Sequence, residues 1–266
     1  MNIRHVILSA VVAFVGLQPQ AKAQVLVNLG SASNFAILGG SAITFSTGGV
    51  IITGDIGSYP TTTVTGIGGV TFVTGVDRSL TTSIMTSAKN DLGTAYDSIT
   101  GQTVTVPGVT AFANNAILTS GVYSIASSTT DITGTLTLNG SANDVFIFKM
   151  SSTLITAASS QILLTGGAQA SNVFWQVPTS ATLGGTSSAF EGNVLAFTSI
   201  DLGVNAMMDG RLLAQNGAVT LGGSDTVTAV PEPAATSVLI AGFLGLVVGV
   251  RRIRRNHSDR KLDSGA

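Results

Sequence analysis

Residues Asp144–Val177 read DVFIFKMSSTLITAASSQILLTGGAQASNVFWQV, and this stretch begins and ends with the same motif. Each copy places a polar residue before Val and then a large apolar residue. Three similar motifs occur elsewhere in the chain: GVYSI from Gly121, NVLAF from Asn193 and RLLAQ from Arg211. Successive copies lie 18 to 28 residues apart, and a strand-like segment rich in Gly, Ser and Thr follows each one. A repeat near 20 residues predicts a solenoid whose coils each add short strands.

An antiparallel sandwich built from similar short strands is the alternative. The repeated unit is longer than a hairpin, and only a few Asn-Gly or Asp-Gly pairs are present to form two-residue turns. The pattern therefore favours the solenoid and leaves the sandwich open.

One segment has a different periodicity. From Val76 to Ile99, apolar residues recur at spacings of three and four, which predicts one amphipathic helix. Its stripe consists of Leu80, Ile84, Ala88, Leu92, Ala95 and Ile99. Asp77 stands where it would cap the helix or interact with its dipole. We expect this helix to lie along a flat face of the sheet.

The composition of residues 24–229 excludes several classes of site. This core has four basic and ten acidic residues, so its formal charge of −6 provides no basic face for nucleic acid. It contains no Cys and no His, because His5 and His257 fall in the terminal segments. Thiolate zinc sites, His metal sites and Ser-His-Asp catalysis are therefore excluded. We predict a non-enzymatic protein without metal or cofactor, although a pair of Asp residues could still hydrolyse glycosides.

Threonine is the abundant residue of the core, with 33 of its 206 residues. Together with Ser, Gly, Val and Ile, it indicates a β-rich domain with a hydroxylated surface.

The first 23 residues have the organisation of a secretory signal peptide. Arg4 and His5 precede an apolar run from Val6 to Leu17, and Ala21-Lys22-Ala23 offers a small-x-small cleavage site. We predict export of residues 24–266.

Residues 230–266 resemble a PEP-CTERM sorting signal. Its three parts are a VPEP motif, an uncharged segment from 234 to 250 at the lower length limit for a membrane-spanning helix, and an arginine cluster. The motif and cluster are formed by Val230, Pro231, Glu232, Pro233, Arg251, Arg252, Arg254 and Arg255. The resemblance implies transient anchoring in the membrane, removal of the tail by a sorting protease, and transfer to the cell surface or beyond. Eleven further residues follow the arginines here, which is longer than usual in that family.

Residues 27–228 resemble the microbial ice-binding protein family. The similar segments include VNLGSASNFAILGGSAIT, GDIGSYP, the Asp144–Val177 stretch, EGNVLAFTSIDL and GRLLAQNGAVTL, in the same order. The resemblance implies a mainly β fold: a discontinuous right-handed β-solenoid, roughly triangular in cross-section, with one long helix (residues 76–99) packed along it. It also implies a monomeric core that binds ice or ordered surface water through one flat face.

Active members of that family often present Thr-(Ala/Gly)-x-(Thr/Asn) on the flat face. Thr offers a hydroxyl and a methyl on a side chain fixed by β-branching, so a charge-free array of Thr can order surface water. Segments 47–50 and 156–159 match this motif in part, whereas 204–207 does not. The candidate face comprises Thr47, Gly48, Val50, Thr156, Ala157, Ser159, Thr186, Ser188 and Asn205. Since Val50 occupies the fourth position, Val50→Thr is predicted to strengthen ice binding.

Two functions are consistent with these residues. The first is an exported ice-binding protein that limits ice growth or recrystallisation. The second is a non-enzymatic adhesion or structural protein of the cell surface or biofilm matrix, with the same fold and little ice affinity.

Overall fold

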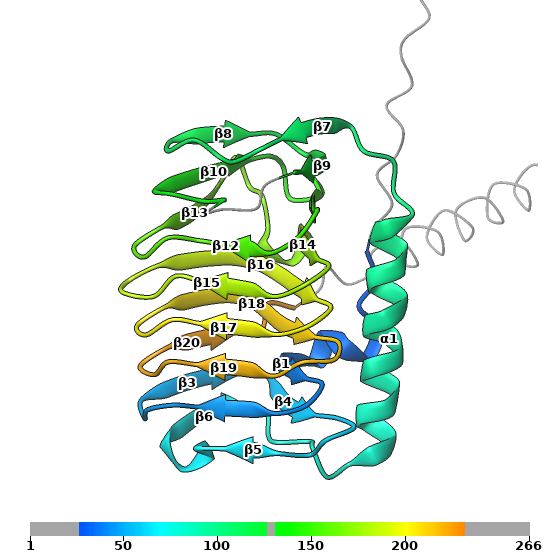
Figure 1. Ribbon diagram of the computed structural model, residues 1–266, viewed down its shortest axis with the longest axis vertical. Helices are drawn as coiled ribbons and strands as arrows, with labels where there is room; N and C mark the ends of the chain where they lie inside the picture. The colour runs from blue at the N-terminus through cyan, green and yellow to red at the C-terminus, as the bar shows by residue number, and fades with distance from the viewer. Residues whose placement is uncertain (1–26, 127–130, 232–266) are drawn as a thin grey trace, which may run out of the picture.

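The computed structural model describes residues 27–126 and 131–231. Parallel strands stack into a β-solenoid with three faces, and one helix lies along its side (Figure 1). The parallel pairing excludes the antiparallel sandwich and confirms the predicted mainly β solenoid. Among the described residues, no helix is long and apolar enough to cross a membrane. The predicted signal peptide and the spanning segment 234–250 fall outside the described ranges.

The helix face is the side of the solenoid covered by α1 (Thr82–Thr100). It consists of β7 (Val106–Val109), β9 (Gly121–Ile125), β11 (Phe146–Met150), β14 (Val173–Val177), the second halves of β16 (Ala189–Ala196) and β18 (Met207–Ala214), β1 (Phe35–Gly39) and β4 (Asp55–Ser58). Strands such as β1 and β14 are buried at every position, because α1 packs on one side and the solenoid interior on the other. Burial on both sides explains why the repeated motifs read as continuous apolar runs.

The other two faces alternate between buried and exposed residues. The six-strand face is formed by β12 (Leu154–Ile155), β15 (Ala181–Leu183), β17 (Ile200–Leu202), β19 (Val219–Leu221), β2 (Ile43–Phe45) and β5 (Val64–Thr65). The third face is formed by β8 (Ala116–Leu118), β10 (Thr135–Asn139), β13 (Gln161–Thr165), the first halves of β16 and β18, β20 (Thr226–Thr228), β3 (Val50–Thr53) and β6 (Val70–Thr74). Short 3-10 helices cover Gly30–Asn34, Ile67–Gly69 and Ala170–Asn172.

The strands β16 and β18 each belong to two faces because they turn at a glycine. Gly192 and Gly210 have φ angles of 106° and 146°, which side-chain-bearing residues rarely adopt. A Cβ on Gly210 would lie 1.9 Å from the carbonyl oxygen of Gly192 in the neighbouring coil. The corner between the third face and the helix face therefore depends on stacked glycines.

The coils do not stack in chain order. The last coil pairs with the first, since β19 pairs with β2 and β20 with β3. Helix α1 then connects the end of the stack containing β5 and β6 to the opposite end containing β7 and β8 (Figure 1). We call the contact between the last and first coils the seam, and it confirms the discontinuous solenoid.

Aromatic rings fill part of the solenoid interior. Tyr123, Phe148 and Trp175 pair in register on β9, β11 and β14, and their rings stack at centroid distances of 5.2 and 4.0 Å. All three are buried, so they form core rather than an exposed platform. The sequence motifs lie on adjacent strands as predicted. In the sheet, Phe146 of β11 lies level with Val173 of β14, and Val194 of β16 lies level with Leu212 of β18.

Helix α1 begins later than the predicted Val76. Its buried residues are Met85, Ala88, Lys89, Leu92, Ala95 and Ile99, whereas Leu80 precedes the helix and is 87% exposed. The predicted stripe is therefore correct from Ala88 onward and wrong at Leu80 and at Ile84, which is 38% exposed. The apolar spacing that predicts the helix extends beyond the start of α1, into the loop that contains Leu80.

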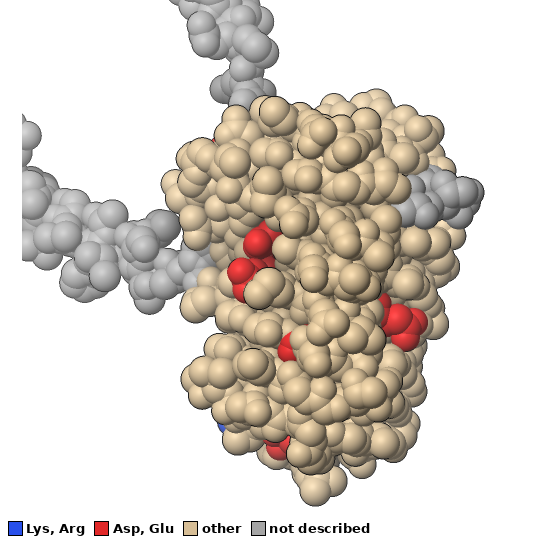
Figure 2. All heavy atoms as spheres, turned by 90° about the vertical axis from the view of Figure 1, so that its left-hand side faces the viewer, with Lys and Arg blue, Asp and Glu red and all other residues tan. Residues whose placement is uncertain are grey.

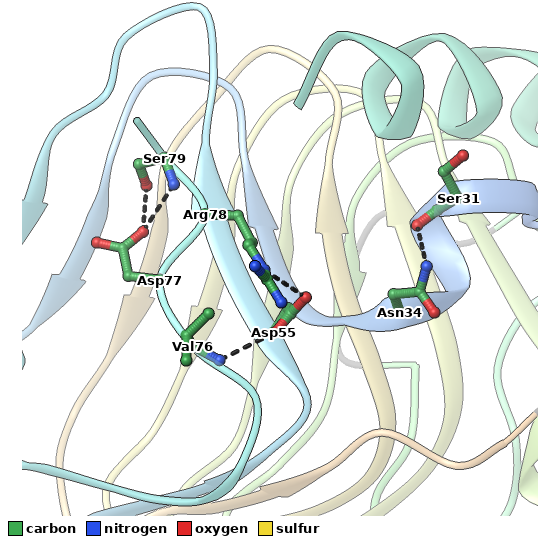
Figure 3. Close-up of polar contacts among 7 residues, drawn as sticks. All are labelled: Ser31, Asn34, Asp55, Val76, Asp77, Arg78 and Ser79. Atoms are coloured by element: carbon green, nitrogen blue, oxygen red, sulfur yellow. Dashed lines mark hydrogen bonds and ion pairs between the residues drawn. The ribbon is translucent and has the colours of Figure 1, made fainter. Parts of the chain in front are cut away.

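That loop, residues 76–81, is fixed by two aspartates (Figure 3). Asp55 accepts a hydrogen bond from the Val76 amide at 2.9 Å and forms an ion pair with Arg78 at 2.8 Å. Asp77 accepts from the amide and the hydroxyl of Ser79, so it closes a turn and does not cap α1.

Arg211 joins the two ends of the domain. Its side chain is 1% exposed, and it donates to the carbonyl of Ser33 at 2.9 Å and to Oδ1 of Asn193 at 2.8 Å. It also donates to the carbonyl of Val230, the first residue of the VPEP motif. The guanidinium thus connects β18 to the N-terminal 3-10 helix and to the C-terminal end of the described chain.

Candidate functional site

One row of side chains runs across the six-strand face. The parallel register places Ile155, Thr182, Asp201, Thr220, Thr44 and Thr65 side by side, one from each strand. All six are at least partly exposed. We call this set the threonine row, since four of its members are Thr. Adjacent members are separated by the spacing between parallel strands, about 4.8 Å.

The threonine row has a simple origin in the sequence. In β15, β17, β19 and β2 the row member stands between two buried apolar residues, as in Ile43-Thr44-Phe45 and Val219-Thr220-Leu221. The flanking residues are buried, so the central side chain must point outward. This apolar-Thr-apolar pattern was the signal that would have identified the row.

The residues beside the threonine row have small side chains and carry little charge. Small residues flank it, among them Ala42, Ala218, Gly203 and Gly222. Figure 2 shows the side of the solenoid away from α1, which is almost free of Lys and Arg and shows Asp and Glu in a few separate places. Within the row, Asp201 is the charged member. The arrangement can therefore present hydroxyls and methyls at a regular spacing.

A second regular array adjoins the row at the corner leading to the third face. We call it the stacked corner, and it consists of Ser159, Thr186, Asn205, Ser224 and Gly49. All five have positive φ angles, between 56° and 86°. Amide-to-carbonyl hydrogen bonds link successive coils, for example from Asn205 to Gly223 at 3.0 Å. All five residues are exposed to solvent.

The structure separates the predicted site residues into two groups. Thr47, Gly48, Ser159, Thr186 and Asn205 are exposed at or beside the stacked corner, and Ala157 is partly exposed. Val50, Thr156 and Ser188 are only 0%, 4% and 4% exposed, so placing them on a binding face was wrong. Thr156 instead accepts a hydrogen bond from the Gly184 amide at 2.8 Å.

The cause of the error is a one-residue difference in coil length. Gly49, not Val50, lies level with Ser224 in the stacked corner, because the first coil has one residue more than its neighbour at this turn. Val50 is then the next residue and points inward. A slip of one position exchanges the buried and exposed sides of a strand.

Val50→Thr is consequently expected to lower the stability of the folded protein, because position 50 does not lie on the surface. The new hydroxyl would enter an apolar interior beside Ile52, at a cost of about 1–3 kcal/mol if it finds no partner. Chemical denaturation measures this change. Ile51→Thr is the matched control, because Ile51 is 41% exposed and the same substitution type there should cost little. Equal stability of Val50→Thr and wild type would contradict the burial of this position.

The third face has a different character. It exposes large apolar side chains at Ile117, Leu163, Met207 and Val73. It also places Glu191 of β16 in register with Asp209 of β18. Burial, and then the negative charge of Asp209, raise the pKa of Glu191 to about 7. Such a surface lacks the uniform small side chains of the six-strand face.

This raised pKa predicts a pH-dependent stability. Because the folded state holds the Glu191 proton more tightly than the unfolded chain, its contribution is complete below about pH 4.5 and is lost as pH rises through about 7. The loss is roughly 1–3 kcal/mol after screening by solvent. Thermal unfolding at pH 5 and pH 8 should show it, and Glu191→Gln should flatten the difference. An unchanged pH dependence in the variant would contradict the raised pKa.

One cleft lies apart from the threonine row and the stacked corner. No three His, Cys, Asp or Glu side chains among the described residues come together as a metal site. The cleft, of about 690 Å³ beside the start of α1, is lined by hydroxyls, by Asn34 and by the Asp55–Arg78 ion pair. Both charged groups of that cleft are already paired with each other (Figure 3). The regular surface, rather than the cleft, is the feature that distinguishes this molecule.

Comparison with known proteins gives one consistent result. A profile described as Ice-binding-like matches residues 37–228. An ice-binding protein of Nostoc sp. (strain HG1) is 38% identical, covering 95% of this chain and 97% of its own. An ice-binding protein of Flavobacterium frigoris (strain PS1) is also 38% identical, over 74% of each chain.

Solved structures of ice-binding proteins are also similar to this chain. The crystal structure of an ice binding protein from an Antarctic biological consortium has a TM-score of 0.71 and 35% identity, covering 79% of this chain and 93% of its own. An ice-binding protein of Antarctomyces psychrotrophicus has a TM-score of 0.70 and 37% identity, covering 77% and 98%. The similarity therefore extends over the whole solenoid, the six-strand face included.

Proposed function

Because the chain belongs to the Ice-binding-like family, we propose that it binds ice through the threonine row and the adjoining stacked corner. The observation that supports this most directly is the register of Thr182, Thr220, Thr44 and Thr65 on one flat, weakly charged face. Their small neighbours leave the hydroxyls and methyls accessible together.

The mechanism is adsorption without chemistry. Row members recur about every 4.8 Å along the solenoid, and outward residues of one strand about every 6.7 Å. Hydroxyls at these intervals hold water by hydrogen bonds, while the methyls between them exclude disordered water. β-Branching fixes the side chains before contact, so little entropy is lost on binding. A protein held on the crystal in this way limits ice growth and recrystallisation.

The direct test measures thermal hysteresis and inhibition of recrystallisation by the purified full chain. Ice crystals grown in its presence should change shape, and grain growth should slow. Unchanged grain size and crystal shape at high micromolar protein would reject ice binding. That result would favour the adhesion or structural role, for which the exposed Val204 and Met207 beside the stacked corner provide a surface.

The terminal segments complete the proposal. Residues 1–23 direct export, and residues 230–266 anchor the protein transiently in the membrane until a sorting protease removes the tail. The working location is then the cell surface or the medium. Mass spectrometry of the protein recovered from cells should find a mature N-terminus at Gln24 and a C-terminus within or before residues 234–250. A C-terminus at Ala266 would contradict processing.

A further inference from the structure

We propose that Asp201 weakens the interaction of the threonine row with ice and divides the row into two unequal parts. The inference rests on the proposed function and concerns how that same surface is tuned. One part contains Thr220, Thr44 and Thr65, and the other contains Thr182 beside Ile155.

The position of Asp201 is fixed by the sheet. Its neighbours in the row are Thr182 on β15 and Thr220 on β19. Within its own strand, Ile200 and Leu202 are 0% and 3% exposed and hold the backbone, so the carboxylate must point out between two threonines. Asp201 is exposed, and within the described ranges its carboxylate forms no hydrogen bond or ion pair with another protein group.

An unpaired carboxylate is unsuited to this place for two reasons. It orients its own hydration shell, and displacing or reorganising that water at a crystal surface has a free-energy cost. It also lacks the methyl that each neighbouring Thr supplies. The interval between Thr182 and Thr220 becomes two coil spacings, about 9.6 Å, without a Thr between them.

The uninterrupted part of the row lies at the seam. Thr220 comes from the last coil, and Thr44 and Thr65 come from the first two strands of this face in the chain. Thr63, one residue before Val64, is exposed close by and adds a further hydroxyl. We therefore assign most of the adsorption to ice to Thr220, Thr44 and Thr65, and a smaller share to the row members on β12 and β15.

The experiment compares Asp201→Thr, Asp201→Asn and Asp209→Thr in the full chain. Asp201→Thr completes a run of five threonines, from Thr182 to Thr65. Its thermal hysteresis should exceed that of wild type by about twofold or more, since an uncompensated charge leaves the contact. Asp201→Asn removes the charge at constant shape and should show part of the gain. Asp209→Thr makes the same substitution on the third face and should leave thermal hysteresis unchanged.

The possible outcomes are distinct. Wild-type activity with no gain in Asp201→Thr would overturn this inference and leave the proposed function intact. Absence of activity in wild type and in both Asp201 variants would overturn both. A gain in Asp201→Thr without any gain in Asp201→Asn would overturn the charge argument. Equal gains in Asp201→Thr and Asp209→Thr would show a general charge effect and also overturn it. Circular dichroism and melting curves confirm that each variant is folded.

Discussion

Replacing Thr220 by tyrosine is expected to abolish most ice binding, with a loss of thermal hysteresis of about tenfold or more. Thr220 lies near the middle of the threonine row, where its uninterrupted part begins, between Asp201 and Thr44. A phenol ring standing above this flat surface would hold its neighbours away from a crystal, and even about 1.4 kcal/mol of lost interaction is tenfold in affinity. Because the side chain points outward, the fold should be retained.

Thr228→Tyr is the matched control for this loss. Thr228 lies in β20, the strand of the same coil that belongs to the third face, and it is partly exposed there. The same substitution at Thr228 should leave thermal hysteresis close to wild type. Equal loss in both variants would contradict the assignment of ice binding to the six-strand face. Full activity of Thr220→Tyr would contradict it as well.

Replacing Arg211 by methionine is expected to produce the largest loss of stability. The side chain is completely enclosed, and its departure leaves the carbonyls of Ser33 and Val230 and the amide oxygen of Asn193 without their donor. Removing one member of a buried charged network costs about 3–5 kcal/mol. For a domain of this size the melting temperature should fall by about 10 °C. Thermal and chemical unfolding of the full chain measure both quantities.

Two further variants sharpen this prediction. Arg78→Met removes an arginine whose side chain is 37% exposed and paired with Asp55, so it should cost at most about 1 kcal/mol. Arg211→Lys keeps the positive charge but lacks the planar guanidinium group. Its loss of stability should therefore lie between those of Arg78→Met and Arg211→Met. If Arg211→Met were no more damaging than Arg78→Met, the connection between the chain ends would contribute little.

The fold could be predicted because its signals are repeated. The apolar motifs recur in successive coils and predict a solenoid, and the resemblance to the ice-binding family implies that it is discontinuous. The start of α1 could not be placed, since the apolar spacing continues through Leu80 into the loop held by Asp55 and Asp77. The burial of Arg211 could not be foreseen either, because its partners lie about 180 residues away and at the chain end.

The candidate site was predicted less well than the fold. The ice-binding motif drew attention to the turns, where one additional residue in the first coil changes which side chains face outward. Val50 was placed on the surface for this reason, and it lies in the interior. The threonine row was missed although four of its six members stand between two apolar residues. Register across coils decides exposure, and it depends on hydrogen bonds between strands distant in sequence.

The seam also affects how the protein can be made. In an ordinary solenoid, each new coil docks on the one synthesised just before it, and terminal coils can be removed one at a time. Here the first coil cannot complete its strand pairing until the last coil has been synthesised, because β2 and β3 pair with β19 and β20. A nascent or truncated chain that lacks residues 219–228 would leave a gap within the stack rather than a shorter end. Long-range pairing of this kind slows folding. The surface that contains Thr44 and Thr220 is thus assembled only when synthesis of the domain is complete.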